Sequence, residues 1–288
     1  MKSDVVFKRG LSDKFVRELQ TGCFSPLLAT ARAANLDVQI REHYLNFYQD
    51  GLSVLRLSEH AVKPFYLARI HWKYLEGISL PDPLRCDDDY RSFAASGQFI
   101  EGFLTHLHAI GRNAEKYARA EATVEQKIVR ASQSPQSPIV FIDRQVQVHG
   151  IQKKADIVGL TGTGQFVITE LKQGLDNRIQ ELLTQIQHYY KTLCVGGFLH
   201  KEVAQSYRKV VLQKQTLGLL SGEVRPPDER YPVKCLIVLY AYNDRSRLLD
   251  RLRQAAKTCF LPVSLVRIPE GKYVLPPAAE WEQLCPPM

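Results

Sequence analysis

A chain of 288 residues, 45% of them hydrophobic, is long enough to bury one or two sizeable cores. Lys and Arg number 38 against 30 Asp and Glu, and the resulting net charge of +8 favours a polyanionic partner. The six cysteines form no Cys-x-x-Cys pair, and no apolar run reaches the roughly 18–20 residues of a membrane span. The N-terminus also lacks a signal-peptide core. These features argue against a structural zinc site, a disulfide framework and a membrane protein, and they predict a cytoplasmic location.

The first third of the chain predicts a small α+β domain, residues 1–96. Residues 11–34 have helical spacing with Ser12-Asp13 as the cap, and residues 36–58 read as a hairpin that turns at Asp50-Gly51. Residues 65–76 fit a strand or a short helix, and residues 81–90 form a proline-rich break. Tyr44, Phe47, Tyr48 and Tyr66 either stack bases or pack a core. We expect this domain to bind substrate, pair protomers in a homo-oligomer or recruit a partner.

The remaining residues, 97–288, predict an α/β domain. The pattern from 91 to 132 is helical, with Gly111 as a joint between two helices. Strands follow at 138–148, 151–160 and 165–172, and His149-Gly150 makes the first turn between them. A helix from about 177 to 194 has Asp176 as its cap. Further elements are predicted in this order: a helix at 202–219, a strand at 234–240, a basic helix at 243–257 and a final strand at 262–268.

Two acids and a lysine meet the requirements of metal-dependent phosphodiester cleavage on these strands. Asp156 lies on one apolar run, and the next run ends in Glu170-Leu171-Lys172. Glu170 and Lys172 are two apart in a strand and therefore share a face. Carboxylates can hold Mg²⁺ through oxygen ligands, and a lysine can orient the attacking water. The backbone carbonyl of Leu171 lies between the two site residues and is a third metal ligand.

The Glu-x-Lys pattern occurs at two other places that do not fit this chemistry. Glu125-Gln-Lys127 lies in a helical pattern, where residues two apart do not share a face. Glu270-Gly-Lys272 lies in a proline-rich tail with no helix after it. Only the pattern at Glu170 ends a β-rich run and has an Asp on the preceding run.

The site carries one geometric condition. A two-residue turn at Gly162-Thr163 would set Asp156 opposite Thr169, on the wrong face of the hairpin. A three-residue loop with Gly164 in the left-handed conformation, or a bulge near Asp156, would set it opposite Glu170. We predict the second register.

These residues resemble the PD-(D/E)xK nuclease superfamily, and in particular its RecB-like and lambda-exonuclease-like branch. The match covers roughly residues 115–195, with Asp156, Glu170 and Lys172 as the motif and Ala155 in place of the usual proline. Gln185-Ile-Gln-His-Tyr189 matches the Gln-x-x-x-Tyr motif of this branch. The resemblance implies a restriction-endonuclease-like core, which runs helix, three-stranded meander, helix, strand. It also implies that Gln185 and Tyr189 position the phosphate backbone of the substrate.

Two further groups of residues are candidates for the site. The superfamily often has a Glu on the first core helix, and here Glu121 and Glu125 are both candidates for it. The alternative for each is a Glu on a solvent-exposed helix face with no role in the site. Alternation along the strand puts Lys154 on the face of Asp156, where it meets phosphate or lowers the pKa of the acid.

The function predicted from the sequence is Mg²⁺- or Mn²⁺-dependent hydrolysis of phosphodiester bonds, with DNA favoured over RNA. One alternative is a nucleic-acid-binding module of the same fold without catalysis. A second is a nuclease in defence against mobile DNA, with a sensing N-terminal domain. A third is a coincidental match in an unrelated α/β protein. End-dependent and internal cutting both remain open.

Overall fold

The computed structural model describes residues 7–34, 36–60, 62–147, 154–174, 179, 181–243 and 245–285. The predicted turn at His149-Gly150 and the predicted cap at Asp176 lie outside these residues. The chain is of mixed α/β class, as predicted, and it divides into two compact units. Unit 1 contains residues 1–8, 127–211 and 221–288, and unit 2 contains residues 9–126 and 212–220. The boundary predicted at 96/97 therefore falls inside unit 2.

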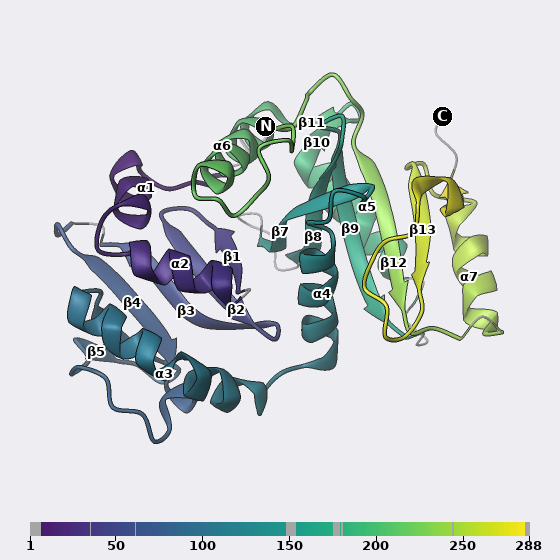
Figure 1. Cartoon of the computed structure of the whole chain (residues 1–288). Coiled ribbons are helices and arrows are strands. Elements are labelled where there is room, and N and C mark those ends of the chain that lie inside the picture. The colour runs from purple at the N-terminus through teal and green to yellow at the C-terminus, as the bar shows by residue number, and fades with distance from the viewer. Residues whose placement is uncertain are drawn as a thin grey trace. The chain divides into compact units, whose positions relative to one another are not determined.

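Unit 2 is built on a six-stranded antiparallel sheet. Its strands are β1 (Asp37–Ile40), β2 (Tyr44–Gln49), β3 (Leu52–Glu59), β4 (Tyr66–His71), β5 (Arg85–Cys86) and β6 (Tyr90–Ala94), in the order β1-β2-β3-β4-β6-β5. Its helices are α1 (Asp13–Gln20), α2 (Ser25–Ala33), the 3-10 turn η1 (Trp72–Leu75) and α3 (Gly97–Glu115). Helices α1, α2 and α3 cover one face of the sheet (Figure 1), where Leu55, Leu57 and Phe93 are buried.

Local signals predicted the turns of unit 2 better than its element boundaries. Ser12 caps α1 by accepting a hydrogen bond from the backbone N–H of Phe15, and Asp50-Gly51 turns from β2 to β3 with positive φ at both residues, as predicted. The helical stretch predicted at 11–34 is confirmed and divides into two helices, and the predicted hairpin has a third strand, β1. Residues 65–76, left open between strand and helix, form both β4 and η1.

The predictions for residues 91–132 were wrong at two points. Tyr90–Ala94 is a strand, and α3 begins only after Ser96, whose hydroxyl accepts a hydrogen bond from the N–H of Phe99. Gly111 is not a joint, because α3 continues through it. The side-chain amide of Gln49, from β2, packs against Gly111, and a Cβ there would lie within 2.6 Å of it, so any larger residue would have to displace that side chain. The next helix, α4 (Ala120–Ala131), begins after a break near Tyr117.

Unit 1 contains a second six-stranded sheet. Its strands are β7 (Ile139–Gln147), β8 (Lys154–Thr161), β9 (Phe166–Gln173), β12 (Lys234–Tyr240), β13 (Val263–Ile268) and β14 (Glu282–Cys285), in the order β14-β13-β12-β9-β8-β7. β7, β8 and β9 form an antiparallel meander, and β12 and β13 run parallel to β9. The strand predicted as the last, β13, is followed by one more, because β14 returns antiparallel to it.

The helices of unit 1 are α5 (Glu181–Leu193), α6 (Lys201–Thr216, whose last turn belongs to unit 2) and α7 (Arg247–Ala256). The 3-10 turn η2 (Ala278–Glu280) precedes β14, and a short hairpin, β10 (Cys194–Val195) and β11 (Phe198–Leu199), follows α5. Helices α5 and α7 bury one face of the sheet against Ile237, Leu239 and Leu265, and α7 lies beside β13 in Figure 1. Burial of these large side chains fixes α5 over the sheet.

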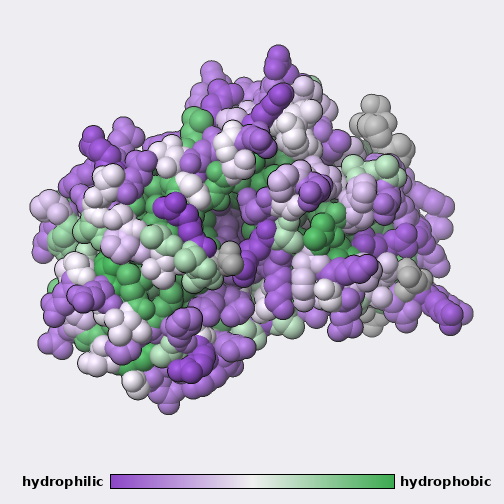
Figure 2. Space-filling model, in the orientation of Figure 1, coloured by the Kyte–Doolittle hydropathy of each residue, from purple (hydrophilic) through white to green (hydrophobic). Residues whose placement is uncertain are grey.

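Hydrophilic residues cover most of the face seen in Figure 2, and hydrophobic residues form smaller, separate patches on it. Within the described residues, no helix has both the length and the apolar character needed to span a membrane.

A lysine is buried in unit 2. Lys214, in the last turn of α6, is 5% exposed and donates a 2.9 Å hydrogen bond to the side-chain oxygen of Gln39. Burial lowers the pKa of Lys214 to about 8, opposed by the charge of Asp37 and assisted by that of Arg41. Since lysine in an unfolded chain has a pKa of about 10.4, the unfolded chain binds more protons between these two values.

We therefore expect the free energy of unfolding to rise with pH above about pH 8, because folding keeps Lys214 neutral where the unfolded chain still binds its proton. Between about pH 7 and about pH 10, the free energy of unfolding of the native chain should rise by about 2 kcal/mol relative to that of Lys214→Met. Urea unfolding of both proteins across this range measures the difference. Lys209→Met, at an exposed position of the same helix, is the control and should follow the native chain. Parallel pH profiles for native chain and Lys214→Met would contradict this.

Candidate active site

The β8–β9 hairpin has the register that the candidate site requires. Ile157 pairs with Thr169 and Leu160 with Phe166, and the N–H of Thr161 donates to the carbonyl of Gln165. The loop therefore consists of residues 162–164, and Gly164 adopts φ of +85°. The predicted three-residue loop is confirmed. Extending the register by one residue sets Asp156 opposite Glu170, on the same face.

Asp156 holds the two strands together where their backbone ladder ends. The last ladder pair is Ile157 and Thr169, and beyond it the N–H of Leu171 donates to Oδ2 of Asp156 at 3.0 Å. The carboxylate thus takes the place of a backbone acceptor. Because the N–H and C=O of one strand residue leave by the same edge, the Leu171 carbonyl also faces β8. The Asp156 carboxylate and the Leu171 carbonyl therefore both direct oxygen atoms, which can act as metal ligands, to the same gap between β8 and β9.

Glu170 and Lys172 lie on the sheet face that α5 covers. Glu170 pairs with Ile237 of β12 and Lys172 pairs with Leu239, and both partners belong to the core beneath α5 and α7. Glu170 is 6% exposed, whereas Asp156 and Lys172 are half-buried. A buried acid beside half-buried groups gives a polar site at the rim of an apolar core.

Tyr189 closes this site from α5. Its hydroxyl donates a hydrogen bond to the carbonyl of Lys154 at the start of β8, and its side chain is 3% exposed. Burial raises the pKa of Tyr189 well above its usual range, and the charges of Glu170 and then Asp156 raise it further. Tyr189 therefore stays a neutral phenol in the neighbourhood of Glu170 and Asp156. Its hydroxyl bonds to backbone, and this is a positioning contact that the sequence did not suggest.

Gln185 lies one helical turn before Tyr189 and is half-buried. Residues four apart on a helix share a face, so Gln185 is on the side of α5 that carries Tyr189. The Lys154 side chain is exposed at the start of β8. Both remain candidates for contact with substrate.

The helix acids Glu121 and Glu125 lie on α4, in the part assigned to unit 2. Glu125 is 3% exposed and Glu121 is half-buried, so the solvated-face alternative does not describe Glu125. Their predicted contribution to a metal shell stays a prediction. Across the described part of the chain, no group of three or more His, Cys, Asp or Glu side chains is placed to hold a metal ion.

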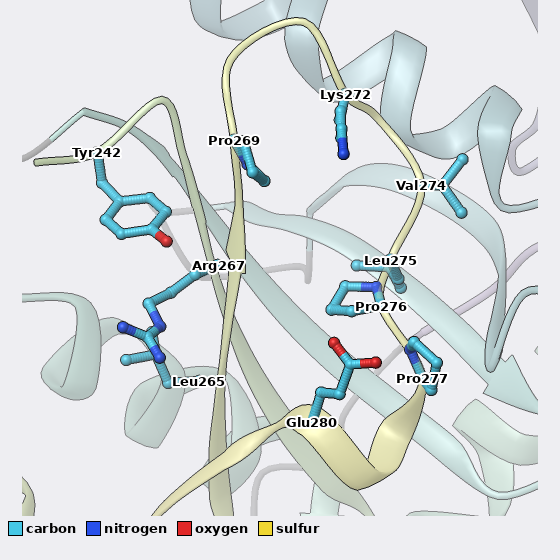
Figure 3. A pocket seen from close by; sticks show the side chains of 10 residues that line it. All are labelled: Tyr242, Leu265, Arg267, Pro269, Lys272, Val274, Leu275, Pro276, Pro277 and Glu280. Carbon is cyan, nitrogen blue, oxygen red and sulfur yellow. The ribbon is translucent and has the colours of Figure 1, made fainter. Parts of the chain in front are cut away.

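A cavity of about 600 Å³ opens on the same sheet, beyond the ends of β12 and β13 (Figure 3). Arg267 and Tyr242 line one side, and Lys272 points into it from the loop that follows β13. Arg267 belongs to the cross-strand row that contains Lys172, with Leu239 of β12 between them. At a strand spacing of about 4.8 Å, the two backbones are roughly 10 Å apart.

No local pattern in the sequence predicts this cavity. Its right-hand wall in Figure 3 is the chain from Lys272 to Pro277, and Glu280 of η2 lies at its lower edge. This segment folds back because β14 pairs with β13, a contact that no local pattern in a proline-rich tail indicates. Lys272 was set aside as part of an isolated Glu-x-Lys, yet it joins the cavity wall.

No known protein-family model matches the chain, and no curated protein sequence matches it.

Proposed function

We propose that the chain is a Mg²⁺- or Mn²⁺-dependent nuclease that hydrolyses phosphodiester bonds, with DNA as substrate. One observation carries the proposal. The three-residue loop at Gly164 sets the β8–β9 register, so that Asp156 and Glu170 share a face with Lys172 two residues on. A gap flanked by two carboxylates and a lysine suits a phosphate only if a cation neutralises the acids.

The donor set fits a divalent cation of the Mg²⁺ type. Asp156, Glu170 and the Leu171 carbonyl supply oxygen donors, which hard cations prefer. Mg²⁺ commonly uses one or two carboxylates together with waters and substrate phosphates, so the lack of a third acid in the described part of the site is compatible with it. A bound Mg²⁺ or Mn²⁺ would lower the pKa of a coordinated water and offset charge on the phosphate.

The remaining residues have separate parts in the proposed reaction. Lys172 donates a hydrogen bond to the attacking water or to the phosphate oxygen on which charge develops. Tyr189 holds α5 against β8 through the Lys154 carbonyl, two residues before Asp156. Gln185, on the same helix face, and Lys154, exposed at the strand start, contact the phosphate backbone on either side of the scissile bond.

The order of elements from α4 to β12 also supports the proposal. A helix precedes the antiparallel meander β7-β8-β9, α5 follows it, and β12 then joins β9 in parallel. This is the order expected of a restriction-endonuclease-like core, and the candidate residues lie on β8, β9 and α5, where the PD-(D/E)xK resemblance predicts them.

Cleavage of labelled DNA with Mg²⁺, Mn²⁺ or EDTA tests the proposal. We expect cutting that depends on the metal, and circular substrates report whether ends are needed. Single-stranded, double-stranded and RNA substrates run in parallel identify the nucleic acid. Binding of DNA without cleavage of any substrate under any metal would overturn the proposal and favour the binding-module alternative.

The cavity beside Lys172 predicts where the substrate backbone continues. Arg267 is exposed in its wall, on the row of Lys172, and a guanidinium there suits a flanking phosphate. We expect Arg267→Ala to raise KM about tenfold with little change in kcat. The slope of the logarithm of the binding constant against the logarithm of the salt concentration should fall by about one, the value for one lost phosphate contact. Steady-state cleavage at several salt concentrations measures both.

Arg225→Ala is the matched control for this variant. Arg225 is exposed and lies near Gly164, at the end of the hairpin away from Asp156. The control should leave KM within about twofold of the native value, because surface arginines distant from the site make no specific contact. An equal rise in KM for both variants would show that only net charge matters.

A further inference from the structure

The sheet of unit 2 carries, on the face opposite to its helices, a row of polar side chains that includes three arginines. The strand registers place Asn46, Arg56, Arg69, Ser92 and Arg85 directly beside one another on five successive strands. We call these five residues the arginine row. The buried residues Leu55, Leu57 and Phe93 alternate with them along the strands, so the row lies on the face opposite to α1, α2 and α3.

Two arginines in this row oppose each other without full compensation. Arg56 and Arg69 form a cross-strand pair, and like charges directly opposite destabilise a sheet. Asp87 neutralises Arg69 through a 2.9 Å ion pair. Arg56 has no carboxylate bonded to it within the described residues. Burial lowers the pKa of Arg56, and the charge of Arg69 lowers it further against the effect of Tyr44.

Polar atoms of the row are shielded from solvent without a partner. Among the residues that the structure describes, Nε of Arg56, Nε of Arg69 and Oδ1 of Asn46 have no hydrogen-bond partner, and these atoms have almost no exposed surface. Buried polar groups in folded proteins are nearly always satisfied by protein, water or ligand. Because both side chains are only half-buried, the two adjacent guanidinium groups can together face an anion that offers several oxygen acceptors.

Aromatic rings flank the two arginines. The Arg56 guanidinium lies 3.7 Å from the ring centre of Tyr44, and that of Arg69 lies 4.8 Å from the ring centre of Tyr90. Beyond Tyr90 the aromatic surface continues, because His71 packs against Tyr90 and stacks on Trp72, which is 43% exposed. Guanidinium groups therefore lie against aromatic rings at two places on this sheet face.

We propose that the arginine row and its flanking tyrosines bind single-stranded nucleic acid. Arg56 and Arg69 contact the phosphate backbone, and bases stack on Tyr44, on Tyr90 and on the guanidinium planes. A single strand suits this surface because bases inside a duplex are paired and stacked on one another and cannot stack on protein side chains. The proposal concerns unit 2 and does not depend on catalysis in unit 1.

Binding of a fluorescein-labelled oligothymidylate to the full chain, measured by anisotropy in EDTA, tests this proposal. We expect Tyr44→Ala and Tyr90→Ala each to weaken binding at least about fivefold, and Arg56→Gln to weaken it and reduce its salt dependence. Arg17→Ala is the matched control, because Arg17 is exposed on α1 and therefore on the opposite side of the same sheet. The dissociation constant of Arg17→Ala for the oligonucleotide should be within about twofold of that of the native chain.

Melting temperatures separate loss of contact from loss of fold. Should Tyr44→Ala melt early, Tyr44→Leu keeps apolar bulk without the ring and replaces it in the comparison. A double variant, Tyr44→Ala with Tyr90→Ala, that is folded and binds like the native chain would overturn the proposal. So would a native chain that binds only duplex, or that does not bind the oligonucleotide at all.

The same measurements repeated in the Glu170→Gln chain keep the two proposals apart. We expect Tyr44→Ala and Tyr90→Ala to lower the affinity for the oligonucleotide by the same factor in the Glu170→Gln chain as in the native chain, since the arginine row does not include Glu170. Failure of metal-dependent cleavage would then leave the binding result intact, and failure of binding would leave the cleavage result intact.

Discussion

Glu170→Gln should lower metal-dependent DNA cleavage by about a thousandfold, the loss expected when a carboxylate that holds the catalytic cation becomes a neutral amide. Gln has nearly the same volume as Glu, so the packing of a residue that is 6% exposed is preserved. The fold should be at least as stable as before, because burying an amide costs less than burying a carboxylate. Initial rates in Mn²⁺ and melting temperatures together test this expectation.

The chain supplies its own control for this variant. Glu270 also stands two residues before a lysine, and it is exposed after β13. Glu270→Gln makes the identical chemical change in the same sequence pattern, and it should cleave DNA at the native rate. A Glu170→Gln chain that is folded and as active as Glu270→Gln would remove Glu170 from the site.

Lys172→Met should reduce the cleavage rate by about a hundredfold, which is typical for loss of a single donor to a developing charge. Lys172 makes its contribution to the reacting phosphate, so DNA binding and metal binding should change little. Met keeps the length and apolar stem of the half-buried side chain. Single-turnover cleavage with saturating enzyme measures the chemical step without the binding step.

Lys191→Met provides the comparison for Lys172. Lys191 is exposed in the last turn of α5, and its replacement changes the net charge by the same amount. If both variants lose activity to the same degree, the effect comes from charge and not from the position of Lys172 beside Glu170.

The candidate site was predictable because its determinants are local. A glycine at the left-handed position of a three-residue loop fixes the hairpin, and the hairpin fixes which side chains share a face. Asp156, Glu170 and Lys172 all lie within one hairpin. Alternation along two adjoining strands was therefore sufficient to predict their arrangement.

The features that the sequence did not predict depend on contacts between distant segments. Gly111 looks like a break, but α3 continues through it, with the Gln49 side chain of β2 packed against it. The strand Tyr90–Ala94 was assigned to a helix, because its pairing with β4 leaves no mark in the local spacing. The opposition of Arg56 and Arg69 likewise depends on the β3–β4 register.

The role of Tyr189 was predicted only in part. Its spacing from Gln185 placed it on the correct helix face, but the pattern could not show that its hydroxyl bonds to the Lys154 carbonyl. That contact depends on how α5 docks on the sheet, which the buried side chains of β12 and α7 determine.

Mn²⁺ binding is the most direct test of the central claim that Asp156 and Glu170 form a metal site. We would titrate Mn²⁺ into the full chain with a phosphorothioate DNA that resists cleavage, and follow free Mn²⁺ by electron paramagnetic resonance. The account predicts that the native chain binds Mn²⁺ and that the folded double variant Asp156→Asn with Glu170→Gln loses this binding. Equal Mn²⁺ binding by the two proteins would contradict it.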